Sequence, residues 1–377
     1  MTQHEWILLN PGPANTTLTV RQALLMPDLC HREPEFFDIM RSCRNRLIRL
    51  ACGGGDESAR EWTAIVFTGS GTAAVEAALA SAVPPDGGVL VVDNGVYGNR
   101  MLRICRAHNL RHHALTSDNV TPVAPAAVGR ILREQRGLSH VAIVHHETTT
   151  GLLNPVAEVA RVAAAEGRRL VVDAMSSLFG DPLDVTTDGI DFVVASANKC
   201  LQAVPGVSFV LARRSAVDAL KGRAPRSVCL DLYDHYAQQE ADSTPFTPAV
   251  QVLHAMEQAL VELEAEGVPN RIARYAENCQ VLRDGMAGLG VGVLIPEGAR
   301  SNVLTTFRLP TGVTYDALHD AMKRRGYVIY AGLADLRAYA FRVANMGTLT
   351  PSDMKTVVDA FAASLDEIAA TSAPRRG

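Results

Sequence analysis

Apolar positions fall into short runs over the first half of the chain, separated by stretches with helical spacing. Seven runs are predicted as β-strands, at residues 64–67, 89–93, 112–115, 141–144, 170–173, 192–195 and 207–211. Helices are predicted before and between them, at residues 19–26, 34–51, 71–83, 100–108, 124–136 and 156–166. Several runs are apolar throughout, the pattern of parallel strands covered on both faces. We therefore expect an open, mostly parallel seven-stranded α/β sheet, which binds ligands at the carboxyl ends of its strands.

The pattern changes after about residue 213. Two long helical stretches, at residues 248–266 and 269–289, lead away from the sheet. Beyond them we expect strands at residues 303–307, 328–330 and 340–343, and helices at residues 315–325 and 351–370. The sequence thus predicts an N-terminal arm at residues 1–18, a large α/β domain at 19–265 and a small C-terminal α+β domain at 266–377.

Composition and charge narrow the class of protein. The chain has 377 residues, of which 47% are hydrophobic and 20% charged, an ordinary globular composition. Its net charge of -4 gives no basic footprint, so we expect neither nucleic acid nor an anionic membrane as a partner. The chain has no apolar stretch of about 18 residues, and therefore we expect no transmembrane helix.

Two features favour the cytoplasm. Residues 1–6 lack the basic start and the apolar core of a signal peptide. The seven cysteines are odd in number and scattered, with no Cys-x-x-Cys pair. They indicate reduced thiols rather than a disulfide framework or a zinc site, so we expect no metal.

A lysine stands between two of the predicted strands. Lys199 closes the segment Ser196-Ala-Asn-Lys, after the strand at 192–195 and before the strand at 207–211. Such a position is unusual because lysine is almost never fully buried without a partner. Taken alone, the segment fits a surface lysine at a strand end better than a catalytic lysine.

A turn rich in glycine follows the first predicted strand. In Thr68-Gly-Ser-Gly-Thr72 the small residues would let backbone N–H groups approach a phosphate, at the N-terminus of the next helix. A plain strand-to-helix turn with a Ser or Thr N-cap explains the segment equally well. The chain has neither Gly-Lys-Thr nor Gly-x-Gly-x-x-Gly at this turn, which disfavours a nucleotide or a dinucleotide.

Three other strand ends carry polar or aromatic residues. Tyr97 lies between Gly95 and Gly98, where its ring could cover a flat ligand, although an exposed loop tyrosine is the simpler explanation. The polar row at 145–151 could cap the following helix. Asp173 ends the apolar run at 170–173, and a buried acid of this kind is costly without a charged partner. A backbone cap or an arginine could serve it, but the apolar strand makes these less attractive than a cationic ligand.

One cofactor explains these features together. Pyridoxal 5'-phosphate needs a phosphate anchor, a ring support, a carboxylate for its pyridinium nitrogen and a lysine for a Schiff base. The turn at 68–72, Tyr97, Asp173 and Lys199 supply one each. Lys199 would also act as the base that moves the proton of the substrate carbon.

The motifs also carry a family resemblance. The chain resembles the class V aminotransferases of fold type I, and within them the 2-aminoethylphosphonate aminotransferases. The matching stretches are residues 8–13, 69–77, 94–101, 146–155, 172–177, 196–200, 229–233 and 341–342, including Glu147-Thr-Thr-Thr-Gly151 and Ser196-Ala-Asn-Lys-Cys200. The resemblance implies exchange of an amino group between 2-aminoethylphosphonate plus pyruvate and phosphonoacetaldehyde plus alanine.

The resemblance implies a role for each matching residue. Lys199 would hold the cofactor, Asp173 would pair with its ring nitrogen and Arg342 would bind the acidic end of the substrate. The remaining cofactor contacts would be Ser70, Gly71, Thr72, Tyr97, Thr148, Met175, Ser177, Ser196, Asn198 and, from the second subunit of a homodimer, Thr247. A phosphate site shared across an interface would make the dimer the working unit.

Other functions stay open at this point. Residues 31–36 resemble alanine–glyoxylate and serine–glyoxylate aminotransferases, and residues 248–251, 330–333 and 343–345 depart from the phosphonate enzymes near the expected substrate end. An alanine- or serine–glyoxylate aminotransferase is therefore the main alternative. A pyridoxal lyase or desulfurase is a more distant alternative. The chain shows no evident catalytic cysteine loop, which counts against a desulfurase. A binding protein without turnover would not need Lys199, Asp173 and Arg342 together.

Overall fold

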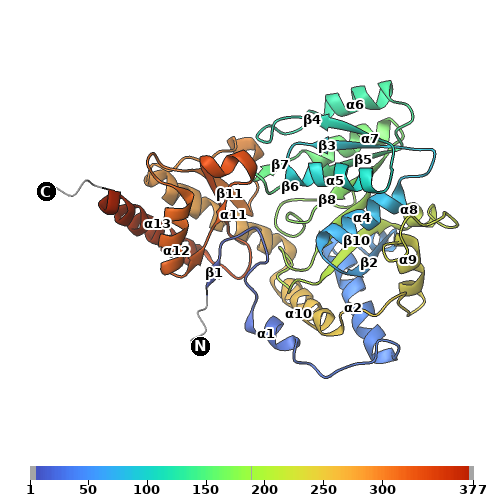
Figure 1. Ribbon diagram of the computed structural model, residues 1–377. Helices are drawn as coiled ribbons and strands as arrows, with labels where there is room; N and C mark the ends of the chain where they lie inside the picture. Colours follow the sequence, from blue (N-terminus) through green and yellow to red (C-terminus); the bar gives the residue numbers. More distant parts are fainter. Residues whose placement is uncertain (1–5, 188, 373–377) are drawn as a thin grey trace.

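The computed structural model describes residues 6–187 and 189–372, and a seven-stranded sheet forms its centre (Figure 1). The strands are β2 (Trp62–Thr68), β3 (Val89–Asp93), β4 (His112–Thr116), β5 (His140–Val144), β8 (Arg169–Asp173), β9 (Ile190–Ser196) and β10 (Val207–Arg213). Their order is β2-β10-β9-β8-β5-β3-β4, and β10 runs antiparallel to both of its neighbours. All seven predicted strands and the mostly parallel sheet are confirmed.

The sheet is buried on both faces, as its continuous apolar runs predict. Along β3, Leu90 and Val92 pack into one hydrophobic core, and Val89 and Val91 pack into another. Successive side chains of a strand point to opposite faces, so an apolar run needs a cover on each face. The helices α4 (Gly71–Ala82) and α5 (Val96–Ala107) contribute to the core around Val89 and Val91.

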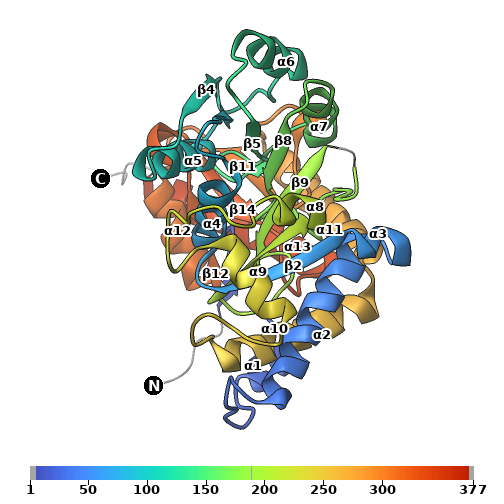
Figure 2. The same ribbon diagram turned by 90° about the vertical axis from the view of Figure 1, so that its right-hand side faces the viewer.

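The opposite face is covered by four other helices (Figure 2). They are α2 (Pro34–Ala51), α6 (Pro125–Glu134), α7 (Val156–Ala165) and α10 (Val250–Glu266). Shorter elements surround the sheet: α1 (Leu18–Ala23), α3 (Asp56–Arg60), α8 (Arg214–Asp218), α9 (Leu232–Glu240) and the hairpin of β6 (His146–Glu147) and β7 (Leu152–Leu153).

The C-terminal part has its own sheet and core. The strands β11 (Leu304–Arg308), β14 (Ala340–Ala344) and β13 (Tyr330–Ala331) form an antiparallel sheet in that order. The helices are α11 (Val268–Gly288), α12 (Tyr315–Arg324) and α13 (Pro351–Ser372), with short 3-10 turns η1 (Glu297–Ala299) and η2 (Ala334–Ala338). From the other end of the chain, β1 (Ile7–Leu8) pairs with β12 (Tyr327–Val328).

The packing partners change at Gly267. The helix α10 packs against α2, whereas α11 packs against α13. Gly267 lies between these helices with a φ of 83°, a conformation that glycine adopts without strain. The division into a large and a small domain at 265 and 266 stays a prediction.

The predicted start of the helix at 100–108 is wrong. The helix α5 begins at Val96, so Tyr97 lies in its first turn and not in a loop. Gly95 and Gly98 had suggested a loop, but a Cβ at Gly98 would lie 2.6 Å from the carbonyl oxygen of Val92. The glycine therefore serves close packing of a helix on the sheet.

The helix α9 has no counterpart among the predicted elements. Its buried positions are Leu232, His235 and Gln239. Two of these three residues are polar, so the helix lacks the apolar stripe that marks a helix in a sequence. Gln239 instead exchanges hydrogen bonds with both backbone groups of Val66 in β2.

Three further expectations concern membrane helices, metal ions and a signal peptide. No helix in the described ranges is long and apolar enough to cross a membrane. Over the same residues there is no cluster of His, Cys, Asp or Glu that could hold a metal ion. Residues 1–5, which bear on the signal peptide and begin the predicted arm, lie outside the described residues.

Candidate active site

A cavity of about 550 Å³ lies where four parallel strands end. It is lined by the last residues of β2, β5, β8 and β9, which are Thr68, Val144, Asp173 and Ser196. The carboxyl ends of parallel strands share one edge of a sheet, which is where such folds bind ligands.

Ten of the thirteen predicted site residues line this cavity. They are Ser70, Gly71, Thr72, Tyr97, Thr148, Asp173, Met175, Ser196, Asn198 and Lys199. Of the others, Ser177 is fully buried, and its hydroxyl has no hydrogen-bond partner within the described part of the chain. Thr247 is exposed and lines a smaller cavity of about 150 Å³ that shares Thr68. Arg342 does not line the cavity, but it donates a hydrogen bond to Thr148, which does.

Lys199 follows β9 and meets the N-terminal arm. Its Nζ donates a hydrogen bond to the carbonyl oxygen of Pro11. A Cβ at Gly12 would lie 2.5 Å from the same Nζ, and the φ of Gly12 is 105°, a conformation that favours glycine. Burial lowers the pKa of Lys199 to about 8, although the Asp173 carboxylate nearby raises it. About a tenth of the amine is then neutral at pH 7.

Asp173 is the acid of the cavity. Its side chain accepts a hydrogen bond from the backbone N–H of Met175 at 2.9 Å, and the residue is 5% exposed. Burial raises its pKa to about 6, while this hydrogen bond and the positive charges of Arg100 and Lys199 lower it. A buried carboxylate with few partners is costly, so the site favours a cation beside Asp173.

The turn before α4 is built for close approach. Ser70 is the N-cap of α4, but its side chain makes no capping hydrogen bond. Capping therefore does not explain this serine. A Cβ at Gly71 would overlap Sδ of Met175, so a larger residue would displace that side chain. The turn presents the N-terminus of a twelve-residue helix to the cavity, where anions are stabilised.

Glu147 fixes the start of α5. The carboxylate is fully buried and accepts hydrogen bonds from the backbone N–H groups of Tyr97 at 3.1 Å and Gly98 at 3.3 Å. Burial raises the pKa of Glu147, and these hydrogen bonds lower it. An acid at a helix N-terminus is favourable. Glu147 of the polar row thus caps α5, which positions Tyr97 at the cavity. The prediction that the row caps the following helix is wrong, because α7 has Pro155 as its N-cap and no side-chain capping hydrogen bond.

Arg342 lies in β14 and is buried, with 3% of its surface exposed. Its Nε donates to the carbonyl oxygen of Ala331 at 2.8 Å, and its Nη1 to that of Thr148 at 2.9 Å. Burial lowers its pKa. No described residue forms an ion pair with Arg342, which leaves its positive charge for another partner.

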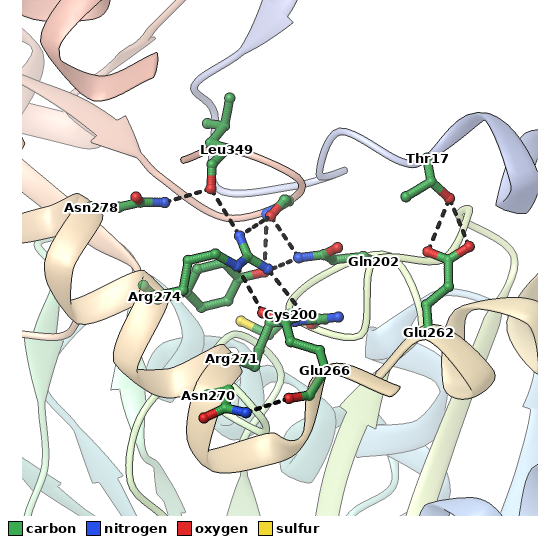
Figure 3. Close-up of polar contacts among 12 residues, drawn as sticks. Thr17, Cys200, Gln202, Glu262, Glu266, Asn270, Arg271, Arg274, Asn278 and Leu349 are labelled. Atoms are coloured by element: carbon green, nitrogen blue, oxygen red, sulfur yellow. Dashed lines mark hydrogen bonds and ion pairs between the residues drawn. The ribbon is translucent and has the colours of Figure 1, made fainter. Parts of the chain in front are cut away.

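The helix α11 forms hydrogen bonds with the residues that follow Lys199 (Figure 3). Arg271 donates a hydrogen bond to the carbonyl oxygen of Cys200 at 2.8 Å. Gln202 donates one to the hydroxyl of Tyr275 at 2.6 Å. Arg274 reaches the carbonyl oxygen of Leu349 at 2.9 Å. The contacts of Arg271 and Tyr275 join the loop after Lys199 to the C-terminal part of the chain.

Polar residues of the cavity that are absent from the predicted site residues include Arg100, His146 and Ser176. Arg100 lines the cavity one helical turn after Tyr97. His146 also lines it, and burial lowers the pKa of this histidine to about 3, so the ring is neutral. Tyr97 and Arg100 are three positions apart, so they lie on the same side of a helix. A predicted helix start at Val96 would therefore have placed Arg100 beside Tyr97.

Comparison with known proteins gives the class of protein. Residues 31–350 match the family described as Aminotransferase class-V. The chain is similar to the crystal structure of pyridoxamine-pyruvate aminotransferase from Mesorhizobium loti, with 26% identity and a TM-score of 0.88 over 97% of this chain and 93% of that chain. The protein therefore belongs to the class V aminotransferases, with the fold-type I architecture that the motifs implied.

Its similarity to curated relatives is more particular. A 2-aminoethylphosphonate–pyruvate transaminase of Syntrophobacter fumaroxidans is 41% identical over 363 residues, which cover 95% of this chain and 96% of that protein. A protein of the same name from Aeromonas hydrophila is 40% identical over 364 residues, 95% of this chain and 94% of its own. The resemblance to this group is confirmed.

Proposed function

We propose that the protein transfers an amino group between 2-aminoethylphosphonate and pyruvate, which yields phosphonoacetaldehyde and alanine, and that it catalyses the reverse reaction as well. The observation that carries the proposal is one cavity that holds both Lys199 and Asp173. The names of the curated relatives support this choice of substrates.

The cavity fits pyridoxal 5'-phosphate. Asp173 is a buried acid that needs a cation, the Ser70–Thr72 turn suits an anion, and Lys199 provides an amine of lowered pKa. When bound, this cofactor supplies an aldehyde that captures amines and a ring that withdraws electrons. Asp173 would hold the ring nitrogen protonated, and Tyr97 would cover the ring.

Lys199 would serve as the proton carrier. In its neutral form the amine accepts the proton from the carbon that bears the amino group of the substrate. Its lowered pKa makes the neutral form accessible near pH 7. The contact with Pro11 and the contacts behind Cys200 limit where the amine can move.

Arg342 would bind the acidic end of the substrate. Its bonds to Ala331 and Thr148 fix the guanidinium, and other N–H groups remain for a carboxylate or a phosphonate. Because Thr148 also lines the cofactor cavity, this contact would hold the guanidinium beside the bound cofactor.

The working unit would be a homodimer. Thr247 is exposed next to Phe246, a large apolar residue that is 40% exposed. A second subunit packed there would bury Phe246 and bring Thr247 to the cofactor phosphate of its partner. The seven cysteines are all free, which supports our placement of the enzyme in the reducing cytoplasm.

Amino-donor profiling tests the proposal. The purified enzyme with added pyridoxal 5'-phosphate would be assayed with 2-aminoethylphosphonate, alanine and serine as donors, each against pyruvate and glyoxylate. We expect the highest kcat/KM for 2-aminoethylphosphonate with pyruvate. Activity with alanine or serine plus glyoxylate, and none with 2-aminoethylphosphonate, would overturn the proposal in favour of a glyoxylate aminotransferase.

A further inference from the structure

Arg100 connects two parts of the cofactor cavity. Its Nη1 donates a hydrogen bond to Oγ1 of Thr72 at 3.1 Å, and Thr72 lies in the first turn of α4. Its guanidinium carbon also lies 4.7 Å from the centre of the Tyr97 ring. The arginine thus contacts both the turn that suits an anion and an aromatic residue that lines the cavity.

None of the residues expected to hold the cofactor phosphate from this chain carries a positive charge. A phosphate monoester carries a charge of about -1.5 to -2 at pH 7. The residues expected to hold it from this chain, Ser70, Gly71, Thr72 and Asn198, are all uncharged, and a helix N-terminus contributes only about half a positive charge. Among the described residues that line the cavity, the positive charges are Lys199 and Arg100.

Lys199 is committed to the aldehyde of the cofactor, so Arg100 is the remaining cation. We propose that Arg100 is the charge partner of the cofactor phosphate. This inference rests on the cofactor of the proposed function and not on the identity of the substrate.

The bond to Thr72 gives Arg100 a second effect. The hydroxyl oxygen of Thr72 accepts a hydrogen from Arg100, which leaves the hydroxyl hydrogen of Thr72 free to point elsewhere. An oxygen of the phosphate is the acceptor that this arrangement suits. Arg100 therefore acts on the phosphate through its charge and also by orienting Thr72.

Isothermal titration of the cofactor-free protein tests the inference. Pyridoxal 5'-phosphate and pyridoxal, which lacks the phosphate, would be titrated into the wild type and into Arg100→Gln. We expect Arg100→Gln to weaken the binding of pyridoxal 5'-phosphate by about 10- to 100-fold, the range for a lost hydrogen bond to a charged group. The binding of pyridoxal should change by less than about twofold.

Two further variants serve as controls. Arg100→Lys keeps the charge but loses the planar fork, so it should restore part of the affinity. Arg103→Gln removes an exposed arginine of the same helix that lines a neighbouring cavity and not the cofactor cavity, so it should bind both compounds as the wild type does. Melting temperatures of all variants would show that each one folds.

The outcomes separate the two proposals. An equal loss of affinity for both compounds in Arg100→Gln would mean that Arg100 supports the Tyr97 ring and does not serve the phosphate. Unchanged affinity for pyridoxal 5'-phosphate would also overturn the inference. If the wild type failed to bind pyridoxal 5'-phosphate at all, the proposed function itself would fall.

Discussion

Asp173 and Lys199 are 26 residues apart in the sequence, yet both line one cavity. The reason is the register of the sheet. The strands β8 and β9 are parallel neighbours, and Asp173 at the end of β8 pairs with Val194 of β9. Lys199 follows five residues after Val194, beyond the same edge. An acid and an amine are thereby brought to the same cavity.

Replacement of the acid tests that arrangement. Asp173→Asn keeps the size of the side chain but removes its negative charge, so a protonated ring nitrogen would lose its partner. Loss of one member of a buried charge pair costs about 3–5 kcal/mol, and we therefore expect kcat/KM to fall by at least about 100-fold. Steady-state kinetics would measure this. Asp86→Asn, at an exposed position, is the matched control and should keep wild-type kinetics.

The lowered pKa of Lys199 predicts an unusual pH profile for its reactivity. Only the neutral amine reacts with acylating reagents, so labelling of Lys199 in the cofactor-free protein should rise with a midpoint near pH 8. The chain has four lysines, and the other three, Lys221, Lys323 and Lys355, are exposed references. Mass spectrometry of the labelled peptides would give each rate.

The effect of Asp173 on the pKa of Lys199 gives a second prediction for the same measurement. The negative charge of Asp173 raises the pKa of Lys199, so Asp173→Asn should move the labelling midpoint of Lys199 to lower pH. A Lys199 midpoint near the ordinary lysine value of about 10.4 would show that burial does not depress the pKa of this amine.

Arg342 should act on substrate affinity. Arg342→Gln removes a positive charge that forms no ion pair with the described residues, and we expect KM for the acidic substrates to rise by about 10- to 100-fold. Initial rates with varied donor and acceptor would show this, together with a melting temperature because the residue is buried. Arg337→Gln, an exposed arginine paired with Asp316, is the control. Unchanged KM in Arg342→Gln would remove this residue from the substrate site.

The packing of α5 on the sheet can be tested by a pair of glycine substitutions. A methyl group at Gly98 would lie 2.6 Å from the carbonyl oxygen of Val92, whereas one at Gly288 would meet no atom within 4 Å. Gly98→Ala should therefore lower the free energy of unfolding by about 1–3 kcal/mol. Gly288→Ala should be neutral or stabilise by up to about 1 kcal/mol. Urea unfolding of both variants would measure this. Equal stability of the two would contradict the close contact.

Much of the fold could be predicted because the sheet is buried on both faces. Its strands are continuous apolar runs, and polar residues at strand ends, such as Asp173, stand out against them. The lysine and the glycine-rich turn were found for the same reason. The start of α5 was misjudged because a glycine required by packing resembles a glycine required by a turn, which hid Arg100.

Other parts of the site depend on contacts that a sequence does not reveal. The burial of Arg342 follows from its bonds to Ala331 and Thr148, and Thr148 is 194 positions away from Arg342. The contact of Lys199 with Pro11 joins residues 188 positions apart. Motifs indicated both ends of each contact but not the contact itself.

Covalent attachment of the cofactor to Lys199 tests the central claim most directly. The protein would be loaded with pyridoxal 5'-phosphate, reduced with borohydride, digested and analysed by mass spectrometry, beside a Lys199→Ala variant. We expect the wild type to show a visible absorption band and to carry the added mass on the peptide of Lys199 alone, and Lys199→Ala to show neither. Added mass at Lys221, Lys323 or Lys355 in place of Lys199, or an unchanged band in Lys199→Ala, would contradict the assignment of the catalytic lysine.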